Sequence, residues 1–285
     1  RDTRLSVTGT FTNEGSISAN RNTLVNLAGD GTNNGIIGAR QDVTLSLASD
    51  LTNADTILAG RNLLFQGETA ENRAGTIIND KGHIEAIDGS VSIFATAFVN
   101  QGTEPTVTTT TTRSRTITPC NWNGGSICDQ HETVTTVVTE TLDQTGESAK
   151  LLSGGNLTID ANTIENRYSD IAANGDVTLT GDTLVNQGRE IVETTTIAKK
   201  EWRYKKKNGR KTFRHVRDRG TTINSVTLDT VPATISAAGN LQGTFTDRID
   251  NESIRENGGQ VGLSSGNAVP STDDLAPVFQ PPSSS

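Results

Sequence analysis

The residues best suited to bind a partner lie in one stretch, residues 199–219. It holds eleven Lys and Arg side chains against two acidic ones, so its net charge is +9. The whole chain has a net charge of −8, so everything outside this stretch sums to −17. Trp202 and Tyr204 also lie here, in a chain with only 4% aromatic residues. Cations mixed with aromatic side chains are typical of a surface that binds an anionic partner.

The dipeptide Asn208-Gly209 predicts that this stretch folds as a hairpin with a two-residue turn. A turn at this place aligns Tyr204 with Phe213, Trp202 with His215, Lys207 with Arg210, Lys206 with Lys211, Lys205 with Thr212 and Arg203 with Arg214. Like charges directly opposite one another destabilise a hairpin. A hairpin that tolerates several such pairs is therefore expected to dock on an acidic surface, with charge steering the approach and the aromatic rings supplying contact area. The alternative is a hairpin that lies back on the acidic remainder of its own chain.

A second candidate site surrounds the two cysteines of the chain, Cys120 and Cys128. The Thr- and Val-rich segments 106–118 and 132–142 predict two long strands on either side of a Gly-Gly turn. We predict a Cys120–Cys128 disulfide, which would stabilise the fold by roughly 2–3 kcal/mol and suggests an oxidising, extracytoplasmic location. A pair of reduced cysteines is the alternative. The loop would hold Trp122 as a binding anchor, unless Trp122 packs back on the body of the protein.

The predicted receptor-binding residues are therefore drawn from both segments. They are Trp122, Trp202, Arg203, Tyr204, Lys205, Lys206, Lys207, Arg210, Lys211, Phe213 and Arg214.

No enzymatic or metal chemistry is predicted. His83, His131 and His215 lie far apart without matching Cys or carboxylate spacing, so we expect neither a metal nor a cofactor. A polysaccharide-cleaving enzyme would need clustered carboxylates, whereas the candidates are dispersed at corners: Asp30, Asp42, Asp50 and Asp55. The strongly acidic remainder of the chain argues against a nucleic acid partner. We also expect no small-molecule substrate, and no helix that spans a membrane.

The elements that must position these residues are short and repetitive. An Asn recurs about every twenty residues, at Asn13, Asn33, Asn53, Asn72, Asn100, Asn166, Asn186 and Asn251. Most of these are followed by an Ile and then by an alternating apolar run such as Val43-Thr44-Leu45. Each unit predicts short strands separated by Gly, Asn and Asp corners, and such a unit can bury its apolar side only by stacking on its neighbours. The Asn is expected at a corner, with the left-handed backbone and a hydrogen bond to the next coil.

The runs Gly155-Asn156-Leu157-Thr158-Ile159 and Gly175-Asp176-Val177-Thr178-Leu179, each followed by an Asn, resemble filamentous haemagglutinin repeats. That family comprises two-partner-secreted proteins of Gram-negative bacteria, including adhesins and CdiA-type effectors of contact-dependent growth inhibition. The resemblance covers residues 1–102, 151–190 and roughly 232–265. It implies an all-β, right-handed parallel β-helix within an extracellular cell-surface filament.

The interruptions of the repeat give the expected domain organisation. Repeats are predicted in residues 1–102, 151–189 and 232–265, with hairpin insertions at 103–150 and 190–231 and a disordered linker at 266–285. Because the chain begins at Arg1 and contains no Met, we expect it to be part of a longer or processed protein.

Two unlike insertions suggest a recognition region more than a plain stalk. The resemblance to CdiA-type effectors implies a monomeric receptor-binding segment that recognises an outer-membrane protein of a neighbouring bacterium for toxin delivery. The alternative is a structural stalk or host-binding segment of a haemagglutinin-type adhesin.

Overall fold

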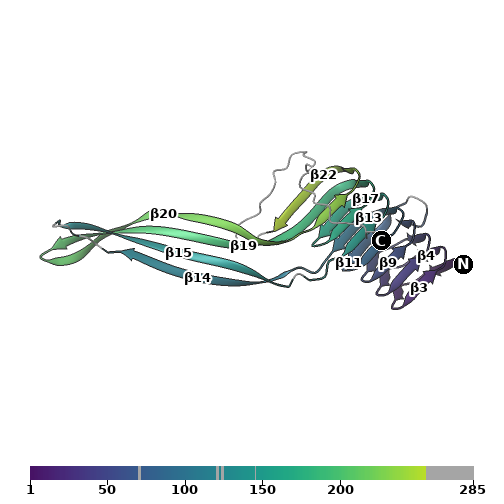
Figure 1. Cartoon of the computed structure of the whole chain (residues 1–285), viewed down its shortest axis with the longest axis horizontal. Helices are drawn as coiled ribbons and strands as arrows, with labels where there is room; N and C mark the ends of the chain where they lie inside the picture. The colour runs from purple at the N-terminus through teal and green to yellow at the C-terminus, as the bar shows by residue number, and fades with distance from the viewer. Residues whose placement is uncertain (70–71, 120–121, 123–124, 145, 255–285) are drawn as a thin grey trace, which may run out of the picture.

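The protein is a rod of stacked coils from which a long arm projects (Figure 1). The computed structural model describes residues 1–69, 72–119, 122, 125–144 and 146–254, without the side chains of residues 214, 215, 253 and 254. In this part of the chain all regular elements are strands. The predicted linker at 266–285 lies outside the described residues.

The strands of the stacked coils form three faces of the rod, and the last described coil contributes to the first two of them. The first face contains β1 (Thr3–Val7), β4 (Thr23–Leu27), β7 (Val43–Leu47), β10 (Leu63–Gln66) and the first halves of β13 (Val91–Gln101), β17 (Leu157–Arg167), β19 (Val177–Lys207) and β22 (Leu241–Ile254). The second face contains β2 (Phe11–Asn13), β5 (Gly31–Asn33), β8 (Leu51–Asn53), β11 (Ala74–Asp80) and later parts of those long strands. The third contains β3 (Ser16–Ala19), β6 (Ile36–Ala39), β9 (Thr56–Ala59), β12 (His83–Ala86), β16 (Lys150–Ser153), β18 (Asp170–Ala173) and β21 (Thr234–Ala237).

The core forms because equivalent residues of successive coils stack in register. Pairing between neighbouring strands within the rod is parallel, so one residue type recurs at each level. On the third face, Ile37, Ile57, Ile84, Leu151 and Ile171 are fully buried in one column. Alternation along each strand leaves the intervening side chains more exposed. The predicted parallel β-helix is thus confirmed.

The recurring Asn forms a continuous internal ladder of hydrogen bonds. Each side-chain amide donates to the side-chain oxygen of the Asn one coil further along, at 2.7–2.8 Å. The ladder runs through Asn13, Asn33, Asn53, Asn79, Asn100, Asn166, Asn186 and Asn251. The predicted bond to the next coil is confirmed, but the predicted left-handed backbone is wrong, because the ladder residues lie at or within strands.

One member of the predicted repeat is also wrong. Asn72 lies in the connection between β10 and β11, where its backbone N–H donates to Thr69. Asn79 takes its place in the ladder, so one coil is enlarged, with 26 residues from Asn53 to Asn79. The register of the strands decides which Asn joins the ladder, and the sequence around Asn72 does not reveal that register.

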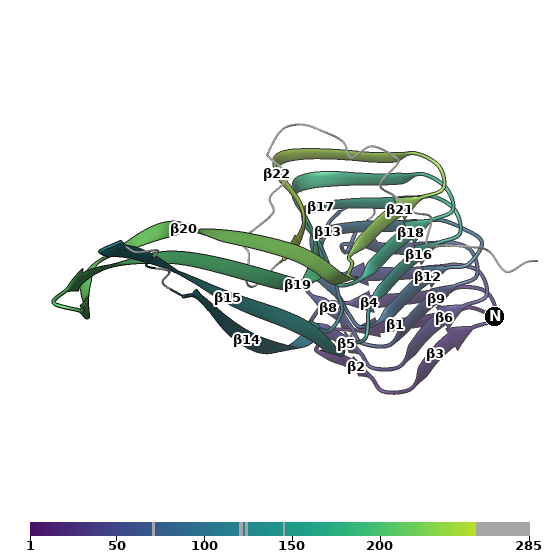
Figure 2. The ribbon, with the colours of Figure 1, turned by 60° about the vertical axis from the view of Figure 1, so that its left-hand side comes forward.

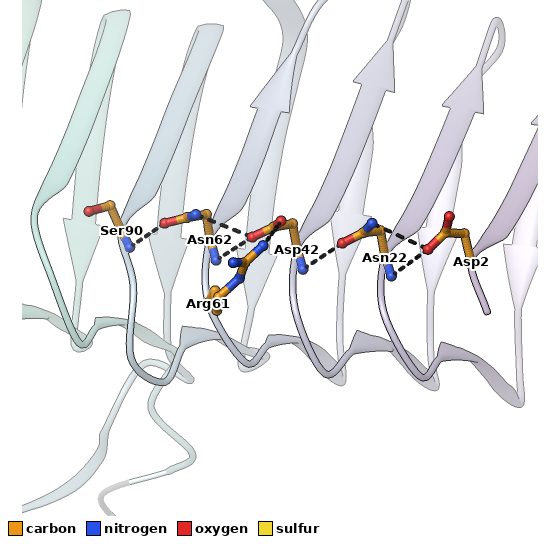
Figure 3. A network of polar contacts seen from close by, with 6 residues as sticks. All are labelled: Asp2, Asn22, Asp42, Arg61, Asn62 and Ser90. Carbon is orange, nitrogen blue, oxygen red and sulfur yellow. Dashed lines mark hydrogen bonds and ion pairs between the residues drawn. The ribbon is translucent and has the colours of Figure 1, made fainter.

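A second polar ladder follows an outer corner of the rod (Figure 3). Asp42 Oδ1 accepts hydrogen bonds from the backbone and side-chain amides of Asn62, each at 3.2 Å, and its Oδ2 accepts one from Arg61 at 2.7 Å. Asp2, Asn22 and Ser90 continue the ladder in both directions. Many carboxylates of the acidic remainder therefore have structural partners at the corners.

Both insertions contain an antiparallel hairpin, and the two hairpins are joined into one sheet. β14 (Thr106–Thr118) and β15 (Ile127–Gln144) pair antiparallel, and so do β19 and β20 (Arg210–Val231). β15 also pairs with β19, so that Ile127–Thr139 lies alongside Glu193–Lys205. The arm is one four-stranded antiparallel sheet in the order β14-β15-β19-β20. Joining the pairs satisfies the backbone groups of two inner strands that separate hairpins would have exposed.

Candidate binding site at the tip of the arm

The arm carries the basic segment away from the rod. β19 begins in the rod at Val177 and runs for 31 residues to Lys207 at the far end of the arm. Both ribbon views show the turn between β19 and β20 at the end most distant from the coils (Figures 1 and 2). The alternative that the basic hairpin lies back on the acidic rod is therefore wrong.

The turn at the tip has the predicted geometry. Asn208 and Gly209 have φ values of 49° and 75°, the left-handed pair that a type I′ turn requires. The predicted register holds for Lys207 with Arg210, Lys206 with Lys211, Lys205 with Thr212 and Tyr204 with Phe213.

A bulge then shifts the register by one residue. Beyond Tyr204, Arg203 pairs with His215 and Trp202 pairs with Val216. The predicted pairs Arg203–Arg214 and Trp202–His215 are therefore wrong. The shift removes one pairing of like charges, which would have destabilised the strands. The side chain of Arg214 lies outside the described residues.

The aromatic rings form a cluster on one face of the tip. The ring of Phe213 meets that of Trp202 at 5.8 Å and that of Tyr204 at 6.2 Å, both edge to face. Phe213 remains 56% exposed. The ammonium group of Lys211 lies 3.8 Å from the centre of the Tyr204 ring. These contacts hold the rings in fixed positions while leaving an exposed apolar edge.

The cysteine loop lies beside this hairpin. The ammonium group of Lys206 lies 5.6 Å from the centre of the half-buried Trp122 ring. The backbone N–H of Lys206 donates a hydrogen bond to the backbone oxygen of Ser126 at 2.8 Å. The structure thus brings Trp122 together with the basic residues, at the tip and not against the rod. Cys128 is buried in β15, opposite Tyr204. Cys120 lies outside the described residues, so the Cys120–Cys128 disulfide stays a prediction.

Carboxylates from within the arm bind two of the cations. Arg203 Nε and Nη2 contact the two oxygens of Asp129 at 2.6 and 2.7 Å. Glu201, whose side chain is only 2% exposed, accepts hydrogen bonds from Arg203 and Arg219. The hydrogen bonds from Arg203 lower the pKa of Asp129 below its usual value. Arg203 is thus a structural residue of the arm as well as a predicted contact residue.

Trp202 has a structural partner too. Its indole N–H donates to Glu132, which also accepts a hydrogen bond from Arg115 at 2.5 Å. The hydrogen bond from Arg115 lowers the pKa of Glu132 the most, and the one from Trp202 lowers it further. Trp202, Glu132 and Arg115 line a shallow cavity of about 110 Å³ together with Ile117, Gln130 and Tyr204. Asp129 and Glu132, the carboxylates that bind Arg203 and Trp202 from β15, belong to the other insertion, and no local signal in the sequence connects them.

Five predicted cations remain exposed at the end of the arm: Lys205, Lys206, Lys207, Arg210 and Lys211. Within the part of the chain that the structure describes, no ion pair joins any of them to a carboxylate. With Trp122, Tyr204 and Phe213 they form what we call the tip surface. The tip surface thus has five positive charges around three aromatic rings. It can bind an acidic surface through the charges and through apolar contact with the rings.

The described residues contain no group of three or more His, Cys, Asp or Glu side chains arranged to hold a metal ion. In the same part of the chain, no helix has the length and apolarity needed to cross a membrane.

Comparison with known proteins agrees with the fold. The haemagglutinin repeat family matches residues 2–86, 97–245 and 220–269. A curated relative from Escherichia coli named Toxin CdiA is 25% identical over 256 residues, which cover 78% of this chain and 8% of the relative. Another Toxin CdiA, from Yersinia pestis, is 39% identical over 79 residues, covering 26% of this chain and 2% of the relative. The chain therefore spans a small part of the curated relatives it matches. No solved structure gives a significant match. Since the family matches extend over most of its length, the chain belongs to the haemagglutinin repeat family.

Proposed function

We propose that the chain is the receptor-binding segment of a secreted cell-surface filament of a Gram-negative bacterium. The tip surface recognises an outer-membrane protein on a neighbouring bacterium, so that the filament can deliver a toxin in contact-dependent growth inhibition. The observation that carries this proposal is the position of the exposed cations and aromatic rings at the far end of an arm that projects from an acidic rod (Figure 1).

The tip surface suits an acidic protein surface for two reasons. The five exposed cations raise the rate of encounter with an anionic partner, and salt weakens this effect. Phe213 and the half-buried Trp122 and Tyr204 supply apolar contact area, and aromatic anchors of this kind contribute much of the energy of many interfaces. Arg203 and Trp202 mainly support the structure of the arm, because their polar groups are bound by Asp129 and Glu132.

The rod has a mechanical role in this proposal. Stacked coils joined by parallel strands and the Asn ladder form a regular filament segment, and the arm is the part that departs from this regularity. The relatives named Toxin CdiA support a role in toxin delivery, while the family supports an adhesive filament. We assign no enzymatic activity to this segment.

The alternative function is a structural stalk or a host-binding segment of a filamentous adhesin. The regular rod favours it, because the coils alone would serve as a spacer. A stalk would not bind bacteria as an isolated segment, whereas a recognition segment would bind them and compete with the full-length filament.

The experiment uses the labelled 285-residue chain and a panel of Gram-negative bacteria, with and without protease treatment of the cell surface. We expect saturable attachment to some strains and its loss after protease treatment. Reversing Lys205, Lys206, Lys207 and Arg210 together to Glu should lower attachment at least tenfold. The matched control reverses four exposed cations of the rod, Arg4, Arg21, Arg40 and Lys150.

Three results would contradict the proposal. They are attachment to no strain, attachment that survives protease treatment, and equal attachment by the folded tip variant and the wild type. Binding to host cells or matrix in place of bacteria would support the adhesin alternative. A screen of target bacteria that each lack one surface protein would then name the receptor.

A further inference from the structure

β20 is an unprotected edge of the arm. Among the described residues its only strand partner is β19. The segment from Gly220 to Leu228 contains no charged residue, and its apolar side chains are unusually open. Ile223 is 65% exposed, Val226 58% and Leu228 52%. An exposed, uncharged strand edge is a template for pairing with another chain, and most proteins protect such edges with charges, Pro or bulges.

Bulges in β20 lie outside the middle of this segment. Residues 220–227 pair with residues 199–192 in an unbroken ladder of eight pairs. The register shifts on either side of it, at Lys199/Lys200 and at Ile191/Val192. The regular section therefore offers a straight edge of about 27 Å to a further strand.

The charges that flank this edge are complementary about its middle. Arg217 lies six residues before Ile223 and Asp229 lies six residues after it. Arg217 and Asp229 pair on β19 with Glu201 and Ile191, which are ten residues apart. The extra residue of each bulge lies in β20, so β19 is continuous over this stretch. Side chains alternate along a strand, so an even separation puts Arg217 and Asp229 on the same face of the sheet. An antiparallel copy of β20 centred on Ile223 would thus place Arg217 of each chain opposite Asp229 of the other.

We propose that β20 pairs antiparallel with β20 of a second copy of this chain, centred on Ile223, and joins two arms into one eight-stranded sheet. This differs from the monomeric segment expected from the sequence. The charge complementarity favours a second copy over an unrelated strand, because a single two-fold axis forms the Arg217–Asp229 pair at both ends of the contact. The proposal does not depend on the tip surface binding a cell.

The pairing is weak in dilute solution, because one strand edge buries less than a standard interface. Filaments held on one cell surface would meet at a high effective concentration, which compensates for this weakness. The association must therefore be measured over a wide range of concentration.

The test is sedimentation equilibrium of the 285-residue chain between about 1 μM and about 1 mM. The wild type should change from the mass of one chain to that of two. Ile223→Lys should stay a monomer over this range, since it places two ammonium groups directly opposite each other. Ile36→Lys, at an apolar rod residue that is 44% exposed, is the matched control and should associate like the wild type.

A charge exchange tests the register. Arg217→Asp and Asp229→Arg alone should each raise the dimer dissociation constant about tenfold, because each places like charges opposite one another. The double variant restores both pairs and should return to within about threefold of the wild type. Circular dichroism verifies that each variant is folded.

Several outcomes would overturn the proposal. They are a monomeric wild type at all concentrations, a dimer that tolerates Ile223→Lys, and a double variant no better than the single ones. A monomer whose β20 amides nevertheless exchange slowly would assign the edge to another segment of the same chain, which also overturns it.

Discussion

The indole N–H of Trp202 donates a hydrogen bond to Oε2 of Glu132 at 2.7 Å, and Oε1 of Glu132 binds Arg115. This contact joins β19, β15 and β14, so it connects the basic hairpin with the strands of the first insertion. Glu132 is almost buried between the two donors, with 8% of its surface exposed. A carboxylate in this position needs both partners to balance the loss of water.

Trp202→Phe should therefore loosen the arm without affecting the rod. The variant keeps an aromatic ring beside Phe213 but removes the donor to Glu132. Amide hydrogen exchange in β15 and the outer part of β19 should become several-fold faster, while the amides of β4 and β7 keep their protection. Tyr204→Phe is the control, because it also keeps its ring. Equal exchange in the Trp202 variant and the wild type would show that the hydrogen bond does not hold the strands together.

Acid should open the arm. The pKa values of Asp129 and Glu132 are lowered in the folded protein, by hydrogen bonds from Arg203 and from Arg115 and Trp202. A lowered pKa contributes stability that is complete above the unfolded value, about 4, and is lost as the pH falls through the folded value. Both Trp residues of the chain lie in the arm, so tryptophan fluorescence reports on the arm alone.

We expect the fluorescence to change below about pH 4 and to recover on return to neutral pH. The double variant Asp129→Asn, Glu132→Gln lacks both carboxylates and should show a smaller acid transition, from a less stable arm at neutral pH. A transition that is the same in both proteins would assign the acid sensitivity to other groups.

The rod was predictable because its information is local and repeated. The spacing of about twenty residues at Asn13, Asn33 and Asn53 gives the coil length directly, and the alternation in Val43–Leu45 gives the inward side chains. The type I′ turn at Asn208-Gly209 was predictable for the same reason, since two adjacent residues specify it. Asn72 was misassigned because only the register of β11 against β8 decides which Asn stacks.

The architecture of the arm could not be read in this way. Pairing of β15 with β19 joins residues about 70 apart, such as Gln130 and Trp202, and each strand alone reads as a member of its own hairpin. The contact between Arg203 and Asp129 could not be read locally either, because Asp129 belongs to the other insertion. Five of the predicted cations are exposed at the end of the arm, but the division between tip surface and internal partners required the structure.

The Asn ladder should carry a measurable share of the stability of the rod. Asn53 is fully buried, accepts a bond from Asn33 and donates to Asn79 and to the backbone of Asp55. Asn53→Ala leaves these buried groups without partners and should lower the free energy of unfolding by about 2–3 kcal/mol in urea titrations. Asn251→Ala, at the exposed end of the ladder, should cost less than about 1 kcal/mol. Equal costs at the two sites would show that burial does not set the strength of the ladder.

Trp122 tests whether the cysteine loop and the basic hairpin act as one surface. Its ring contacts Lys206 and is half-buried, so Trp122→Ala removes apolar area at the tip without disturbing the rod. If the tip surface binds as proposed, this variant should lower attachment to target bacteria about tenfold, with an unchanged urea midpoint. Lys206→Gln should also weaken attachment, and the double variant should lose less than the sum of the two single effects, because each substitution breaks the same cation–π contact. Additive losses would mean that Trp122 and Lys206 bind independently, and full attachment by the folded Trp122 variant would remove the cysteine loop from the proposed site.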